Sequence, residues 1–158
     1  MKTAQYKKQQ GFTLIELLVV IGILAILLAI VLIAINPARQ FAQANNTKRN
    51  ADVIAILNAI NQYAADNKGV LPPGTPASGL TSPTYITSAT TGQAFCDALM
   101  PRYVAALPTD PTGANSGNNV TNCASYDTGY WISVGSDNRV TIMAPYQVPA
   151  TASISATR

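Results

Sequence analysis

The sequence predicts an α+β protein in which a long N-terminal helix packs on a small antiparallel β-sheet head. First, the stretch from Leu17 to Ile35 holds no charged residue, and Gly22 is its only position without an apolar side chain. Second, apolar residues recur every three or four positions from Phe41 onward, which is typical of an amphipathic helix. Third, the last third of the chain contains two β-rich runs separated by a turn sequence. A chain of 158 residues has room for one modest domain beside such a helix.

The composition argues against several functional classes. The net charge of +3 comes entirely from Lys2, Lys7 and Lys8, because the seven basic and seven acidic residues after Gly11 cancel. The net charge therefore predicts no direct nucleic-acid binding. The chain has no histidine, which removes the commonest general base and the commonest metal ligand. With no Ser/His/Asp set or phosphate loop recognisable either, we expect no enzymatic activity, no cofactor and no metal site.

Residues 1–11 form a basic leader, and the apolar run after it is long enough to cross a membrane. Nineteen residues at about 1.5 Å each span roughly 28 Å, close to the hydrocarbon thickness of a bilayer. We therefore expect a transmembrane segment at about residues 14–35, with a cytoplasmic N-terminus behind the lysines and an extracytoplasmic head. A secretory signal peptide would have a shorter apolar core and an A-x-A cleavage site after it. Here the small residue, Gly11, precedes the apolar run, so cleavage there would retain the helix.

One acid, Glu16, lies at the start of the apolar run, where a carboxylate is costly. Thr13-Leu14-Ile15-Glu16 is a capping-box sequence, so Thr13 and Glu16 are expected to bond free backbone N–H groups at the helix start. On this interpretation Glu16 is simply an acid near the interface that the helix dipole favours. The alternative is a functional role, because the cost of burying the carboxylate grows with depth.

The helix is expected to continue to about residue 68, so that residues 12–68 form one long element. Pro37 lacks an N–H and clashes with the carbonyl of Ile33, which predicts a kink there. The apolar stripe comprises Phe41, Val53, Ile56, Leu57, Ile60 and Tyr63; the polar positions opposite include Lys48, Arg49 and Asp66. We expect the stripe from Val53 onward to pack on the head.

Residues 69–158 are expected to form the head. The predicted parts are a Pro- and Gly-rich loop over 69–91 with an extended piece at 85–87, a short helix over 93–100, a polar loop over 113–122, and a hairpin of strands 130–134 and 139–143. Tyr103, Val104 and Leu107 are predicted core contacts, and Trp131 is expected in the core or on a sheet face. After Pro145 the chain turns polar, and residues 151–158 are expected to be a loose tail.

Cys96 and Cys123 both fall in the region expected outside the membrane. An even number of cysteines in such a compartment favours a disulfide between them, with two separate buried thiols as the alternative.

The segment Lys7-Lys8-Gln9-Gln10-Gly11-Phe12-Thr13-Leu14-Ile15-Glu16, continuing into Leu17 to Ile21, resembles the prepilin signal of the type IV pilin family. That family includes the pseudopilins of type II secretion and of DNA-uptake systems. The resemblance implies a pilin-like fold, cleavage between Gly11 and Phe12 by a membrane peptidase, methylation of the Phe12 nitrogen, and an assembly role for Glu16. Many type IV pilins carry a proline deeper in the apolar stretch than Pro37.

The function implied is structural: a membrane-held prepilin that is cleaved, N-methylated and polymerised into a type IV pilus or similar filament outside the membrane. The implied partners are copies of itself and other pilins, the prepilin peptidase and methyltransferase, and an inner-membrane assembly platform with its ATPase. One alternative is a pseudopilin of a type II secretion or DNA-uptake system. Another is a surface-binding module that uses the helix only as an anchor.

The loop before the hairpin also resembles the region where some type II secretion pseudopilins bind calcium. The nearby acids Asp110, Asp127 and Asp137 lack the close spacing of a calcium loop. We therefore interpret them as turn-forming residues.

Overall fold

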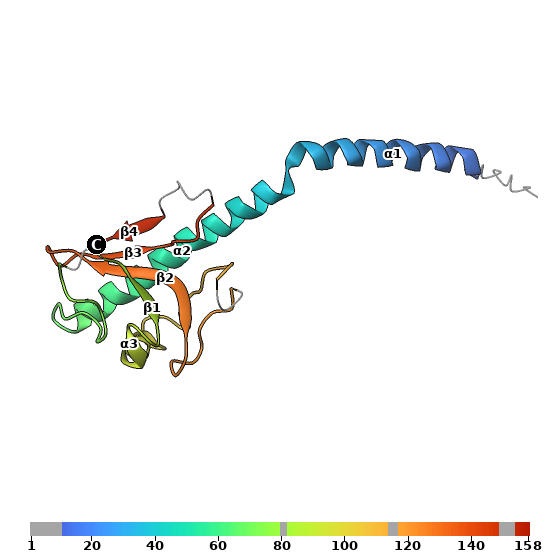
Figure 1. The fold of residues 1–158 in the computed structure, drawn as a ribbon. Helices are drawn as coiled ribbons and strands as arrows, with labels where there is room; N and C mark the ends of the chain where they lie inside the picture. The colour runs from blue at the N-terminus through green and yellow to red at the C-terminus, as the bar shows by residue number, and fades with distance from the viewer. Residues whose placement is uncertain (1–10, 80–81, 114–116, 149–153) are drawn as a thin grey trace, which may run out of the picture. The chain divides into compact units, whose positions relative to one another are not determined.

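The computed structural model describes residues 11–79, 82–113, 117–148 and 154–158, and divides the chain into two compact units, residues 1–40 and 41–158. The elements in chain order are α1 (Leu14–Ile35), α2 (Pro37–Asp66), β1 (Thr84–Thr87), α3 (Gly92–Leu99), β2 (Asp127–Val134), β3 (Val140–Met143) and β4 (Ser155–Thr157), as Figure 1 shows. The predicted α+β class is confirmed. Residues 1–10 of the expected leader lie outside the described residues.

The long helix is divided at Asn36, where the sequence predicts a single helix kinked at Pro37. α1 ends at Ile35, and Asn36 adopts a left-handed backbone with φ of 46°. A residue before proline avoids the helical region, and asparagine tolerates the left-handed one. Pro37 is the first residue of α2, where a missing N–H costs nothing. The Asn36 carbonyl accepts the Arg39 N–H at 3.1 Å and so starts the new helix.

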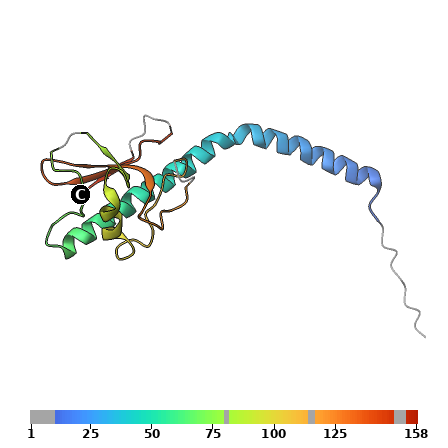
Figure 2. The ribbon, with the colours of Figure 1, turned by 60° about the horizontal axis from the view of Figure 1, so that its bottom comes forward.

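The head contains one antiparallel sheet in the order β1-β2-β3-β4. The predicted hairpin is confirmed as β2 and β3, with Ile132 opposite Ile142. The expected extended piece and short helix are confirmed as β1 and α3. In both views α2 lies across one face of the sheet (Figures 1 and 2).

The prediction of a loose C-terminal tail is wrong for residues 155–157, which form β4. Arg158 and Val140 exchange backbone hydrogen bonds of 2.9 and 3.1 Å, and the hydroxyls of Thr141 and Thr157 lie 2.8 Å apart. Ile154 and Ala156 pack against the core. A polar sequence suits this strand because it is at the sheet edge and only alternate side chains face inward. Residues 151–153 of the expected tail lie outside the described residues.

The core of the head lies between α2, α3 and the inner face of the sheet. Its fully buried apolar side chains include Val53, Ile56, Ile60, Ile86, Phe95, Leu99, Leu107, Ile132 and Ile142. The predicted stripe is therefore confirmed from Val53 onward, and Leu107 is a core residue. Phe41, which belongs to the same predicted stripe, is instead 71% exposed.

A buried ion pair joins α2 to the loop after Leu107, and the sequence analysis missed it. Arg49, predicted on the polar face of the helix, is only 1% exposed, and Asp110 is fully buried. Arg49 Nε donates to Asp110 Oδ2 at 2.6 Å, and Nη2 donates to Asp110 Oδ1 at 3.1 Å. The Thr112 N–H and hydroxyl each donate to Asp110 Oδ1 at 2.8 Å. The turn-forming role predicted for Asp110 is thus present, with a buried guanidinium added.

Two glycines make room for Asp110. A Cβ on Gly129 would lie 3.0 Å from Asp110 Cβ, and one on Gly113 would lie 3.1 Å from the same atom. Gly129 also has φ of 73°, which side chains rarely adopt. The Asp110 N–H donates to the Thr128 carbonyl at 2.9 Å. The pair therefore joins α2, the 108–113 loop and β2.

A second polar group on α2 flanks this pair. Asp52 accepts a hydrogen bond of 2.8 Å from the Tyr130 hydroxyl and lies 3.4 Å from Lys48 Nζ. Lys48 Nζ also donates to the Thr109 carbonyl at 2.9 Å. Burial, and then the hydrogen bond to Asp52, raise the pKa of Tyr130, so its hydroxyl stays protonated.

The predicted disulfide between Cys96 and Cys123 is present, with Cα atoms 5.5 Å apart. It ties α3 to the loop before β2 across 27 residues of chain. Closing a loop of this size stabilises a fold by about 3–4 kcal/mol in the chain-entropy account.

Removing one partner of the buried pair should destabilise the head strongly. We expect Arg49→Met to lower the free energy of unfolding by about 3–5 kcal/mol, because it leaves the Asp110 charge buried without its counter-charge. The measurement is urea unfolding of the full chain in detergent, followed by the fluorescence of Trp131. The matched control is Arg49→Met with Asp110→Leu, which removes both charges and should lose less stability. Equal losses in the two variants would contradict this account.

The same pair predicts loss of stability in acid. Burial alone would raise the pKa of Asp110, but the hydrogen bonds from Arg49 and Thr112 hold this pKa below its ordinary value of 3.8. The unfolded chain then binds the proton more readily, so the stabilisation is complete above about pH 4–5 and is lost as pH falls through the lower folded pKa. Urea unfolding between about pH 3 and pH 7 should show this fall, with a shallower fall in the Arg49→Met/Asp110→Leu variant. Parallel profiles would contradict it.

Candidate functional site

The residues around the start of α1 form the candidate site. Thr13, with φ of −80° and ψ of 151°, is the N-cap residue of α1. Its hydroxyl accepts the Glu16 N–H at 3.3 Å, while its own N–H and hydroxyl donate to Glu16 Oε2 at 2.9 and 2.7 Å. The predicted capping box is confirmed. It fixes the Glu16 carboxylate against the first turn of the helix.

Gly11 and Phe12 precede the helix and are exposed. Phe12 is 91% exposed, and neither residue belongs to a helix or strand. A Cβ added at Gly11 would meet nothing within 4 Å. The fold around the site therefore leaves the Gly11–Phe12 peptide bond accessible and does not itself require glycine at position 11.

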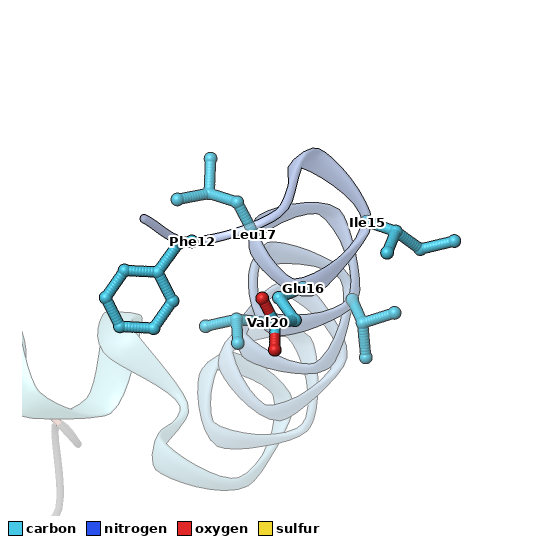
Figure 3. A pocket seen from close by; sticks show the side chains of 6 residues that line it. Phe12, Ile15, Glu16, Leu17 and Val20 are labelled. Atoms are coloured by element: carbon cyan, nitrogen blue, oxygen red, sulfur yellow. The ribbon is translucent and has the colours of Figure 1, made fainter. Parts of the chain in front are cut away.

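The Glu16 carboxylate lies in an apolar hollow at the helix start (Figure 3). The hollow is lined by Phe12, Ile15, Glu16, Leu17, Val19 and Val20. Glu16 is thus the one charged group among five apolar side chains. The sequence analysis did not predict this hollow. The lining residues are one, three or four positions from Glu16, and the helical spacing of three and four places side chains on the same face.

α1 is apolar on every side. None of its residues is buried, and the best 18-residue window has a mean hydropathy of 3.5. Among the described residues it is the one helix that is long and apolar enough to cross a membrane. So many exposed aliphatic side chains need an apolar environment, which a bilayer or other apolar helices can supply.

The other residues singled out in the sequence lie away from this site. Pro37 begins α2, and Cys96 and Cys123 form the disulfide of the head. Asp127 and Asp137 each accept a backbone N–H two residues on, from Gly129 at 2.9 Å and Arg139 at 3.2 Å. Both are therefore turn-forming residues, as predicted.

Comparisons with known proteins agree with this arrangement. Residues 6–32 match the family model of the prokaryotic N-terminal methylation motif. The chain is similar to the type II secretion system core protein G of Escherichia coli (strain K12), with 31% identity over 106 residues that cover 67% of this chain and 68% of that protein. It is 38% identical to the core protein G of Aeromonas hydrophila over 63 residues, which cover 40% of this chain and 43% of that relative. No solved structure matches the chain.

Proposed function

Since the chain belongs to the pilin and pseudopilin family, we propose that it is a prepilin-type subunit of a secretion pseudopilus. In this proposal the chain is cleaved after Gly11, methylated at the Phe12 nitrogen and polymerised through α1. The observation that carries it is the exposed apolar helix, preceded by the accessible Gly11–Phe12 bond, with the capped Glu16 in its first turn. The two type II secretion relatives favour a pseudopilus over a type IV pilus for the filament.

The apolar surface of α1 serves two states in this proposal. Before assembly it lies in lipid, and the chain is a membrane protein. In the filament the same side chains pack against α1 of other subunits. Transfer from lipid to another apolar helix gains little hydrophobic energy, so close packing and polar pairing have to drive the exchange.

Glu16 supplies that polar pairing. Cleavage creates an ammonium group on Phe12, which lines the same hollow as Glu16 and stands four residues before it. A carboxylate in apolar surroundings gains most from a counter-charge with a hydrogen bond. Methylation keeps the charge of the amine. The uncut chain has no charge at this nitrogen, so processing becomes a condition for assembly.

The proposed topology places the leader in the cytoplasm and the head outside the membrane, where the Cys96–Cys123 disulfide is chemically stable. The proposed partners are other copies and other pseudopilins, a membrane peptidase with methyltransferase activity, and an assembly platform with its ATPase.

The subunit in purified filaments should begin at N-methylated Phe12. Mass spectrometry of the N-terminal peptide checks this directly. Gly11→Leu should leave the head and α1 unchanged, because space is open around position 11, but should block cleavage because the side chain is no longer small. Filaments built from chains that still begin at Met1 would contradict the proposal.

Glu16→Gln should be cleaved normally yet enter filaments at least about tenfold less, because the amide cannot neutralise the Phe12 ammonium in apolar surroundings. The measurement is the ratio of filament to membrane subunit by immunoblot in the native host. The matched control is Asp137→Asn, the same change in an exposed turn of the head, and it should assemble as the wild type does. Wild-type incorporation of Glu16→Gln would rule out the pairing.

A further inference from the structure

Three uncharged side chains are exposed on the first turns of α2 and on the segment after β3, and are called the base patch here: Phe41, Tyr146 and Val148. Their exposed fractions are 71%, 45% and 54%. Val148 is held to α2 by Asn46, whose side-chain amide donates to the Val148 carbonyl at 2.5 Å and accepts its N–H at 3.2 Å. The segment after β3 accordingly reaches the early turns of α2 (Figure 1).

Tyr146 lies beside the buried ion pair. A Cβ on Gly129 would be 3.7 Å from Tyr146 Cε2 and 3.0 Å from Asp110 Cβ. The Tyr146 hydroxyl lies 3.4 Å from the Tyr85 hydroxyl. The Tyr146 ring therefore lies near Gly129 and Asp110, and Asn46 binds the backbone of Val148.

Phe41 lies on the side of α2 that carries Arg49. Positions 41, 45 and 49 follow one another at four-residue spacing and share one helix face. Exposure falls along this face, from exposed Phe41 through half-buried Asn45 to buried Arg49. The head thus stops covering the face two turns before Arg49 and leaves an aromatic ring open.

The chain path limits what can cover this ring. Phe41 lies six positions after Ile35, the last residue of α1. Six residue steps span about 9 Å if helical and at most about 22 Å if extended. The headgroup layer is about 5–7 Å deep on each side, so Phe41 lies within it when the chain after Ile35 runs along the membrane surface rather than straight away from it.

The charged residues near the end of α1 favour an anionic partner. Between Glu16 and Asp52 the charged residues are Arg39, Lys48 and Arg49, all basic. Arg49 is neutralised by Asp110, and Lys48 Nζ lies 3.4 Å from Asp52, which leaves the charge of Arg39, two residues before Phe41. Tyrosine side chains such as Tyr146 prefer the membrane–water interface, and basic residues near it are attracted to anionic headgroups.

We propose that, before assembly, the base patch rests in the headgroup layer of the membrane that holds α1, and that its partner is an anionic lipid surface. Tyr146 and Val148 reach that layer only if the head lies against the membrane. The inference rests on the membrane anchoring in the proposed function and is independent of polymerisation.

The test places a single tryptophan at chosen positions of the full chain. Trp131 is the only tryptophan, and its Nε1 atom is buried without a hydrogen-bond partner in the described structure, so Trp131→Phe loses no such bond. Each variant then adds one new tryptophan to the Trp131→Phe chain: Phe41→Trp, Tyr146→Trp or Ile54→Trp. Ile54 is a matched exposed position, 46% exposed, thirteen residues further along α2 and on the opposite face. Each variant is reconstituted, at high lipid-to-protein ratio, into vesicles of phosphatidylcholine and phosphatidylglycerol with or without brominated chains.

The brominated lipid should quench the fluorescence of Phe41→Trp and Tyr146→Trp about twofold and leave that of Ile54→Trp almost unchanged. The bromine atoms are carried by the lipid chains and quench only a tryptophan that lies in or beside the bilayer. Tyr146→Trp decides the matter, since its position is far from α1 in the sequence. Quenching of Tyr146→Trp no greater than that of Ile54→Trp would overturn the proposal. So would quenching that grows with protein density, because a second copy would then be the occupant. Flotation of the vesicles measures membrane anchoring separately. A chain whose α1 fails to insert does not float with the vesicles, and this result is distinguished from an anchored chain whose base patch stays in water.

Discussion

The buried pair of Arg49 and Asp110 is the interaction on which the head depends. Two charges removed from water are tolerated only when each is met by the other and by further hydrogen bonds. Here the carboxylate receives donors from Arg49 and Thr112, and the guanidinium also donates to Asn46 Oδ1 at 2.9 Å. Gly113 and Gly129 leave the space beside the Asp110 side chain, and Gly129 also has a positive φ of 73°. One turn of α2 therefore sets the path of a loop, a strand and the segment after β3.

α1 has the opposite requirement. The head buries its apolar residues within itself, whereas α1 buries none and depends on what surrounds it. The chain thus consists of a unit that buries its own apolar residues and a helix whose apolar residues need apolar surroundings, either lipid or other apolar helices. Glu16 is the polar residue that makes exchange between those two environments selective in the proposed function, because its carboxylate is already bonded by Thr13 and still lies among apolar side chains.

The division of the helix at Asn36 separates these two units along the chain. Asn36 ends α1 in a left-handed conformation, and Pro37 starts α2 without needing a hydrogen-bond donor. Arg39 and the exposed ring of Phe41 follow within two turns of α2. The junction between the apolar helix and the head therefore combines a backbone break, a positive charge and an exposed aromatic ring.

Features that depend on local chemistry can be predicted from the order of the residues alone. The capping box of Thr13 and Glu16, the apolar helix, the amphipathic stripe from Val53, the β2–β3 hairpin and the cysteine pair all follow from residue type and spacing. The remaining features depend on contacts between residues far apart in the chain. Arg49 looked like a solvent-exposed helix residue until a loop 61 positions away brought Asp110 to it. Residues 155–157 looked like a polar tail because a strand at a sheet edge gains its order from backbone pairing with β3, which side-chain patterns do not record.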